Sequence, residues 1–455
     1  MRSWLIIILS LLGTQTRAQE LTLDDFLAIV KAHHPIAYRA DLAAEAGVLK
    51  VKKAKGAFDP KLEGRLDQKY FDDQTYYSRL NAGMKVPTWF GITAGAGFQQ
   101  NEGVQLNPER LTPDPGLWYA GLQITLGNGL FIDQRRAELK QAKIFQNSSE
   151  LKQRLMLNQL LFDAKVAYWD WFKIYNKQAV YIEALTNAEF RLNAIRSSAE
   201  FGDKPYVDTL KGVIQVQNRI TKLTEFTYEL QNKINQMEVF LWKDGFIPLE
   251  LDTLAQPGNF RNFNPDLPDL IDPSERDSIL QNHPELLYAE NDIDIAEINF
   301  RIKREQLKPD LTLKYNALNS GAFDNYNVEN YTWGATVSYA PFTRKERAEA
   351  NLARVKLEDQ KAKLADKRAV VGYKLDKSYN DWISSRQQVD IYRLAEDNYR
   401  RLYEAEFELF NNGESSLFLV NVRDQDWIEA RIKLIDLLYD TQVAKAAFYY
   451  QIVRI

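Results

Sequence analysis

Few residue types in this 455-residue chain could support catalysis or bind a metal ion. It contains three histidines and no cysteine. His34 and His283 each precede a proline, a position that disfavours the α-helical conformation. Both histidines therefore indicate helix ends and not a set of metal ligands. The sequence predicts that the protein is not an enzyme and that it has no catalytic residues, no cofactor and no metal site.

A run of 69 residues from Arg344 to Asn412 has no proline and only one glycine. As a helix it would be about 100 Å long. Such length is typical of a coiled coil, a helical repeat or a membrane span, and this run is too charged to span a bilayer. Asn412-Gly413 is a good helix stop, and a second helical run follows. The pattern predicts an antiparallel helical hairpin with its tip near Gly413.

The chain contains an internal repeat. Early landmarks recur 249 residues later, and landmarks after residue 131 recur 211 residues later. The first copy therefore has about 38 extra residues, between Pro60 and Phe131. The matched positions are His34-Pro35 with His283-Pro284, Pro60 with Pro309, Phe131 with Phe342, Trp171 with Trp382, and Gly202 with Gly413.

The first 18 residues are typical of a secretory signal peptide. Arg2 provides the positive start, residues 4–12 the apolar stretch, and Thr16-Arg17-Ala18 a cleavage site. A short buried helix is the alternative. Without cysteine, a lipid anchor on a cysteine after the signal is excluded. No later segment has 18 consecutive apolar residues, so an exported protein that belongs in a membrane would have to use strands.

Segments of alternating apolar and polar residues occupy about 61–127 in the first copy and about 310–341 in the second. Alternation over roughly ten residues is typical of transmembrane barrel strands, with one face toward lipid and one toward the lumen. A soluble sheet with one buried face is the alternative. The segments end in aromatic residues that suit membrane interfaces: Tyr70, Phe71, Tyr76, Tyr77, Trp89, Phe90, Trp118, Tyr331, Trp333 and Phe342.

The helical segments carry heptads. Two apolar stripes on the last helix indicate neighbours on both sides, as in a closed ring of helices, whereas a solitary coiled-coil rod needs one stripe. The first seam comprises Val216, Ile220, Leu223, Thr227, Leu230, Ile234, Met237 and Leu241. The last helix has Ile428, Ile432, Ile435, Tyr439, Gln442, Ala446 and Tyr449, with a second stripe of Trp427, Leu434 and Leu438.

These features define four segments. Residues 1–18 are the signal peptide, and 19–243 the first repeat, with a hairpin tip near 202. Residues 244–275, rich in proline, form an irregular linker around the helices. Residues 276–455 are the second repeat, with a tip near 413.

The chain closely resembles the TolC-like outer-membrane efflux protein family (outer membrane factors) over residues 19–455. The resemblance lies in Leu21–Phe26, the two His-Pro pairs, the Pro60 and Pro309 junctions, and a first tip with glycine at 202 and aspartate six residues on. It implies a homotrimer whose strands form one outer-membrane β-barrel, continuing into a long α-helical coiled-coil barrel across the periplasm. It also implies docking of the tips onto a periplasmic adaptor protein and an inner-membrane transporter.

The resemblance also implies that functional residues lie at the hairpin tips. In a trimer, Asp208 would form a ring of carboxylates at the tunnel entrance; alternatively it is an acid at a helix N-terminus, stabilised by the helix dipole. The second tip departs from the family pattern, with Leu419 six residues after its glycine. The extra 38 residues predict one hairpin beyond the family's four strands. The candidate tip residues are Gly202, Asp203, Asp208, Gly413, Glu414, Arg423 and Asp424.

The function expected from the sequence is an exit duct in the cell outer membrane. It would serve a tripartite efflux or type I secretion system and conduct substrate passively from the periplasm or the inner-membrane pump to the exterior. A non-conducting periplasmic coiled-coil scaffold is the alternative. The net charge of −4 gives no reason to expect nucleic-acid binding, and the sequence does not identify the cargo.

Overall fold

The computed structural model describes residues 20–202, 205–252, 255–265, 273–322 and 329–453; the predicted signal peptide lies outside them. The chain forms two compact units. The sheet unit comprises Asp41–Arg154 and Ser278–Val370, and the hairpin unit comprises Met1–Ala40, Leu155–Asp277 and Val371–Ile455. Every helix among the described residues is too short or too polar to cross a bilayer.

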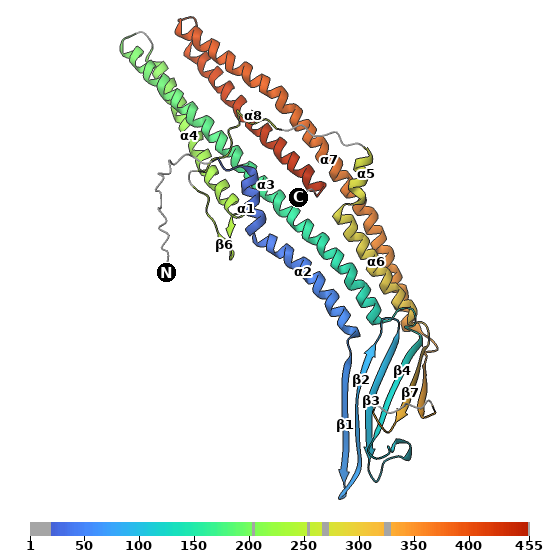
Figure 1. Ribbon diagram of the computed structural model, residues 1–455. Coiled ribbons are helices and arrows are strands. Elements are labelled where there is room, and N and C mark those ends of the chain that lie inside the picture. Colours follow the sequence, from blue (N-terminus) through green and yellow to red (C-terminus); the bar gives the residue numbers. More distant parts are fainter. Residues whose placement is uncertain (1–19, 203–204, 253–254, 266–272, 323–328, 454–455) are drawn as a thin grey trace, which may run out of the picture. The chain divides into compact units, whose positions relative to one another are not determined.

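The sheet unit contains an antiparallel sheet in the order β1-β2-β3-β4-β7-β8 (Figure 1). The sheet has six strands, two more than the four that the family resemblance implies. Four of them come from the first half of the chain, where the extra residues were placed. The strands are β1 (Lys61–Phe71), β2 (Gln74–Pro87), β3 (Ile92–Glu102), β4 (Leu117–Gly127), β7 (Asp310–Asn319) and β8 (Tyr331–Ser338).

The register gives the sheet two chemically distinct faces. Leu62 pairs with Met84, and Met84 with Ala96; paired residues in neighbouring strands lie on the same face. The apolar face carries Leu62, Leu66, Leu80, Ala82, Met84, Ala96, Phe98, Trp118, Ala120, Leu122, Ile124, Leu313, Tyr315, Trp333, Ala335 and Val337. The polar face carries Glu63, Arg65, Asp67, Arg79, Asn81, Lys85, Gln99, Asn101, Gln123, Lys314, Asn316 and Thr332.

Four helices lead to this sheet: α2 (Pro35–Lys55), α3 (Gln134–Glu200), α6 (Pro284–Glu305) and α7 (Arg344–Asn411). A hydrogen bond from Gln153 to Asp41 (2.7 Å) joins α3 to α2, and one from Gln141 to Asn299 (2.8 Å) joins α3 to α6. The helices α2 and α3 approach closely at Gly47, where an added Cβ would lie 2.9 Å from Ser149 Cβ. The close approach therefore requires glycine.

The hairpin unit contains two helical hairpins, α3 with α4 (Tyr206–Glu238) and α7 with α8 (Leu417–Gln451) (Figure 1). The turns contain Gly202 (φ +83°) and Gly413 (φ +79°), in the left-handed region that favours glycine. The helix expected over residues 344–412 is thus confirmed as α7. The unit also holds α1 (Leu23–His33), the first part of α5 (Pro273–Gln281), and the two-residue strands β5 (Trp242–Lys243) and β6 (Ile247–Pro248).

The two histidines before prolines end or begin helices. His283 is the N-cap of α6, and its Nδ1 accepts a hydrogen bond from the Glu285 amide (3.2 Å). His34 follows α1, and its Nδ1 accepts one from the Ile36 amide (3.0 Å). Both rings are buried. Their role in the structure is therefore that of helix caps, in line with the sequence interpretation.

The core of the hairpin unit is built around α3 and α8. Trp171, Phe172 and Ile174 of α3 are almost fully buried, as are Ile428 and Ile435 of α8. The linker covers part of this core, because Phe263 packs 5.1 Å from Trp169 between ring centroids and Phe260 is buried. On α8, residues from both predicted stripes are buried: Ile428, Leu434, Ile435, Leu438, Gln442 and Ala446.

The seam predicted for α4 is confirmed in part. Met237 and Leu241 are buried, and Leu223, Leu230 and Ile234 pack against the core of the unit. Ile220 is 46% exposed, and Thr227 is also exposed. The other buried positions of α4, outside the predicted series, are Thr209, Gly212, Arg219 and Phe226. Arg219 interrupts the apolar pattern because its guanidinium is paired with an acid inside the unit, as described below.

Candidate functional site

The first tip combines the Gly202 turn with the N-terminus of α4; the predicted Asp203 lies outside the described residues. Asp208 is in the first turn of α4. Its side chain is partly buried and forms an ion pair with Lys211 Nζ at 3.0 Å. A carboxylate at this position also interacts favourably with the helix dipole. The position thus suits both sequence interpretations of Asp208.

The second tip is a short turn between α7 and α8. The Gly413 amide donates to the Phe410 carbonyl (3.1 Å), and the Glu414 amide to the Leu409 carbonyl (2.9 Å). The Ser416 hydroxyl then caps α8 by accepting from the Leu419 amide (3.4 Å). Gly413 and Glu414 are exposed at this turn.

Arg423 and Asp424 lie further along α8, in different environments. Arg423 is half-buried and pairs with Asp426 at 3.3 Å. Asp424 is only 3% exposed and accepts hydrogen bonds from Arg191 Nη2 (2.8 Å) and Arg219 Nη2 (3.1 Å). Its carboxylate therefore lies between α8 and the α3/α4 hairpin, and within this chain it is not presented to solvent at the tip.

The Asp424 carboxylate belongs to a cluster that joins all four long helices, here called the Asp424 cluster (Asp424, Arg191, Arg219, Gln425 and Tyr403). Arg219 also donates to Gln425 Oε1 (2.6 Å), and Arg191 donates to the Tyr403 hydroxyl of α7 (3.0 Å). Burial raises the pKa of Tyr403, so the phenol stays protonated. Two guanidiniums thus share one buried carboxylate, and the sequence analysis did not identify either arginine.

An aromatic contact extends this connection along α8. The Tyr403 ring stacks on Trp427, with centroids 5.4 Å apart. The Trp427 indole donates to Glu396 of α7 (2.8 Å), and the Arg431 guanidinium lies 5.0 Å from the Trp427 ring. Arg431 also pairs with Glu183 of α3 at 2.6 Å. The α7/α8 hairpin is therefore held to α3 by charged and aromatic contacts below the tips.

At the sheet, the apolar face is exposed to the surroundings. Leu62 is 84% exposed, and Trp333 and Val337 are each 69% exposed. Leaving a large aliphatic or aromatic side chain in water costs about 1.5–3 kcal/mol relative to burying it. A contiguous apolar surface of this kind marks contact with another protein or with lipid.

The polar face is charged and partly covered by the loop between β3 and β4. The Asn101 amide donates to Thr112 Oγ1 (2.9 Å), and Asn101 Nδ2 donates to the Arg110 carbonyl (2.9 Å). The loop and the strands enclose a cavity of about 660 Å³, lined among others by Arg65, Asp67, Arg79, Glu109, Arg110 and Lys314. Residues 103–116 therefore fold over the polar face of the sheet.

No group of histidines or acids that could hold a metal ion occurs in the part of the chain that the structure describes. A family model described as "Outer membrane efflux protein" matches residues 276–450. That family is one of outer-membrane channels and not of enzymes. No curated protein matches the sequence significantly.

Solved outer-membrane channels have a similar fold. The open-state MtrE channel of Neisseria gonorrhoeae has a TM-score of 0.69 at 12% identity, covering 97% of this chain and 93% of that one. The CmeC channel of Campylobacter jejuni has a TM-score of 0.67 at 14% identity, covering 94% and 85%. A membrane protein from Pseudomonas aeruginosa has a TM-score of 0.67 at 14% identity, covering 94% and 90%.

At such low identities these likenesses establish the fold alone. Together with the family match, they confirm the resemblance expected from the sequence. Residues 276–450 match the outer membrane efflux protein family, and the chain has the fold of solved outer-membrane channels of the TolC-like kind.

Proposed function

We propose that the protein is the outer-membrane exit duct of a tripartite efflux or type I secretion system. In this proposal it conducts substrate passively, and an inner-membrane transporter supplies the driving force. The observation that carries the proposal is the six-stranded sheet with one exposed apolar face and one charged face. Lipid on the first face and water on the second satisfy both sets of side chains.

The free edges of the sheet support a shared barrel. β1 and β8 are the edge strands, and each has a row of backbone groups with no partner strand within the described residues. In a bilayer these groups must be paired, because no water reaches them. Pairing β8 of one copy with β1 of the next would close the barrel. With the homotrimer that the family resemblance implies, the barrel would have about 18 strands, in the range of water-filled channels.

The long helices would continue this barrel into the periplasm. The two hairpins have nearly equal first helices, 67 residues in α3 and 68 in α7, and both turn at a glycine with positive φ. This similarity supports an internal duplication with repeats at 19–243 and 276–455 around the linker 244–275. We place the docking surface for the periplasmic adaptor and the inner-membrane transporter at the tips.

Among the tip residues, the proposed roles differ. Asp208 would contribute to a carboxylate ring at the entrance, and the exposed turn residues Gly202, Gly413 and Glu414 would contact the adaptor. Asp203 follows Gly202 in the sequence and is proposed as a further adaptor contact. Arg423 and Asp424 would act below the tip, Asp424 by holding the two hairpins together.

Electrical recording from the purified protein tests the duct against the scaffold. The duct should need detergent for solubility, migrate as a trimer and give discrete single-channel conductance in planar lipid bilayers. A monomer that is soluble without detergent and gives no conductance would favour the non-conducting periplasmic scaffold.

A further inference from the structure

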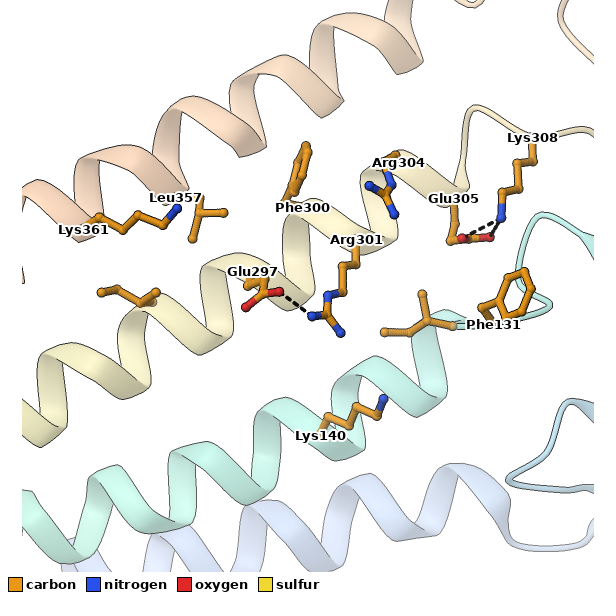
Figure 2. Close-up of a pocket in the computed structure, with 12 residues that line it drawn as sticks. Phe131, Lys140, Glu297, Phe300, Arg301, Arg304, Glu305, Lys308, Leu357 and Lys361 are labelled. Atoms are coloured by element: carbon orange, nitrogen blue, oxygen red, sulfur yellow. Dashed lines mark hydrogen bonds and ion pairs between the residues drawn. The ribbon is translucent and has the colours of Figure 1, made fainter.

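A pocket of about 690 Å³ lies in the sheet unit between the beginning of α3, α6 and α7 (Figure 2). It is close to the ends of the strands. Phe131, on its wall, is four residues after the end of β4, and Lys308 is two residues before β7. The pocket is therefore at the helical end of the sheet and not at the end where the β3–β4 loop lies.

The pocket is rich in positive charge. Its lining has five cations and two acids, and the acids are already paired. Glu297 pairs with Arg301, and Glu305 pairs with Lys308 at 2.8 Å (Figure 2). Within the described chain, Lys140 and Arg304 have no acidic partner. The five cations are Lys140, Arg301, Arg304, Lys308 and Lys361.

Apolar side chains line the same pocket. Leu357 and Ile132 are buried in its wall, and Phe300 projects from α6 beside the cations (Figure 2). Phe131 is 73% exposed, and Lys308 Nζ lies 4.8 Å from its ring centroid. Positive charge next to exposed aromatic surface suits a ligand with an anionic head and an apolar body.

Arg301 and Arg304, in the wall of the pocket, lie on a different side of α6 from a hollow that adjoins the polar face of the sheet. Lys303 and Gln306 line this neighbouring hollow, together with Asp310 and Ser338, and Lys308 borders both hollows. Asp310 of β7 and Ser338 of β8 are opposite each other in the sheet register, on its polar face. At 3.6 residues per turn, the stripe of Arg301 and Arg304 points away from Lys303 and Gln306. Arg301 and Arg304 therefore face away from the hollow beside the polar face, and Lys308 lies at the boundary between the two hollows.

We propose that this pocket binds the phosphate headgroup of an anionic phospholipid, with the acyl chains lying along the apolar face of the sheet. The inference rests on the proposed function, because it requires lipid around the strands. Headgroups lie where lipid-facing strands end, and basic residues at that depth attract anionic lipids. Arginine can hold a phosphate through two parallel hydrogen bonds. The adjoining apolar surface favours a lipid over a free phosphate ion.

The test is native mass spectrometry of the full-length protein in detergent, titrated with dioleoylphosphatidylglycerol or dioleoylphosphatidylcholine. The pocket variant carries Lys140→Gln, Arg301→Gln and Arg304→Gln. A control variant, Lys152→Gln, Arg154→Gln and Lys356→Gln, removes the same charge from exposed cations outside the pocket. Circular dichroism checks that both variants keep the helical content of the wild type.

The pocket variant should bind phosphatidylglycerol about tenfold more weakly or worse, while the control stays within about twofold of the wild type. Phosphatidylcholine binding should not distinguish the variants. An equal loss in both variants, or no loss in either, would overturn the proposal. Displacement of phosphatidylglycerol by millimolar inorganic phosphate would also overturn it, because the site would then recognise the ion alone. Conductance of the wild type in planar bilayers tests the proposed function separately.

Discussion

Removing the carboxylate of Asp424 should loosen the α8 segment next to the second tip. Asp424 lies between the Arg191 and Arg219 guanidiniums, and all three residues are buried. Removing one partner of a buried ion pair typically costs about 3–5 kcal/mol, because the remaining charge stays buried and uncompensated. In Asp424→Asn the side chain keeps its shape, but two arginines face an uncharged amide.

Hydrogen–deuterium exchange of the α8 amides measures this effect locally. A loss of about 3 kcal/mol in opening free energy corresponds to exchange faster by roughly two orders of magnitude in residues near 424. The control is Asp426→Asn, two residues further along the same helix. Asp426 forms a half-exposed pair with Arg423, and its loss should cost less than about 1 kcal/mol.

A double-mutant cycle separates the interaction energy of the Asp424–Arg219 pair from the effects of the two single substitutions. Combining Asp424→Asn with Arg219→Gln should cost less than the sum of the single changes, because the second change removes one of the uncompensated cations. Exchange near residue 424 that is unchanged in Asp424→Asn, or equal to that in Asp426→Asn, would refute the inference that this carboxylate holds the hairpins together.

Three further predictions concern the tip, the loop and a buried histidine. Asp208→Ala should change cation selectivity or blockade by multivalent cations in single-channel recordings; no change in either would leave Asp208 as a helix N-terminal acid. Replacing residues 103–116 with a short Asn-Gly turn should raise the conductance, because the loop covers the polar face; an unchanged conductance would mean that the loop does not narrow the path. Burial lowers the pKa of His34 below its ordinary 6.5, so the stability it contributes is present above pH 6.5 and is lost as the pH falls toward the folded-state pKa. His34→Asn should flatten this pH dependence in thermal unfolding between pH 7 and 5, and an identical profile would exclude His34 as its source.

The strands of the sheet could be predicted from the sequence because the pattern that indicates them is local. Each strand alternates apolar and polar side chains, and the period of two fixes which residues share a face. The long helices could be predicted for a related reason. A 69-residue run without proline leaves few alternatives to a helix. What the alternation cannot specify is the surroundings of each face, because a soluble sheet with a buried face has the same pattern.

The buried surface of α4 was predicted only in part, for a physical reason. A search for apolar heptads selects Ile220 and Thr227, whereas the structure buries Gly212 and Arg219. Glycine permits close approach to Leu192, and arginine is buried because an acid from α8 neutralises it. Neither contribution appears on a hydrophobicity scale.

The sequence near the tip also did not reveal that Asp424 is buried. Its partner Arg191 is 233 positions away and Arg219 is 205 positions away. A single sequence does not reveal such long-range pairs. The same holds for the cationic pocket, because Arg301 and Arg304 resemble an ordinary solvated helix face until Lys140 and Phe131 are placed beside them.

The orientation of the sheet faces tests the central claim most directly, and the absence of native cysteine makes the measurement simple. Single cysteines are introduced along β2 as Leu80→Cys and Met84→Cys on the apolar face, and as Asn81→Cys and Lys85→Cys on the polar face. The protein is reconstituted in lipid vesicles and treated with a water-soluble maleimide. The exit duct predicts alternation, with labelling at 81 and 85 and protection at 80 and 84. Equal labelling at all four positions would contradict a lipid-embedded sheet.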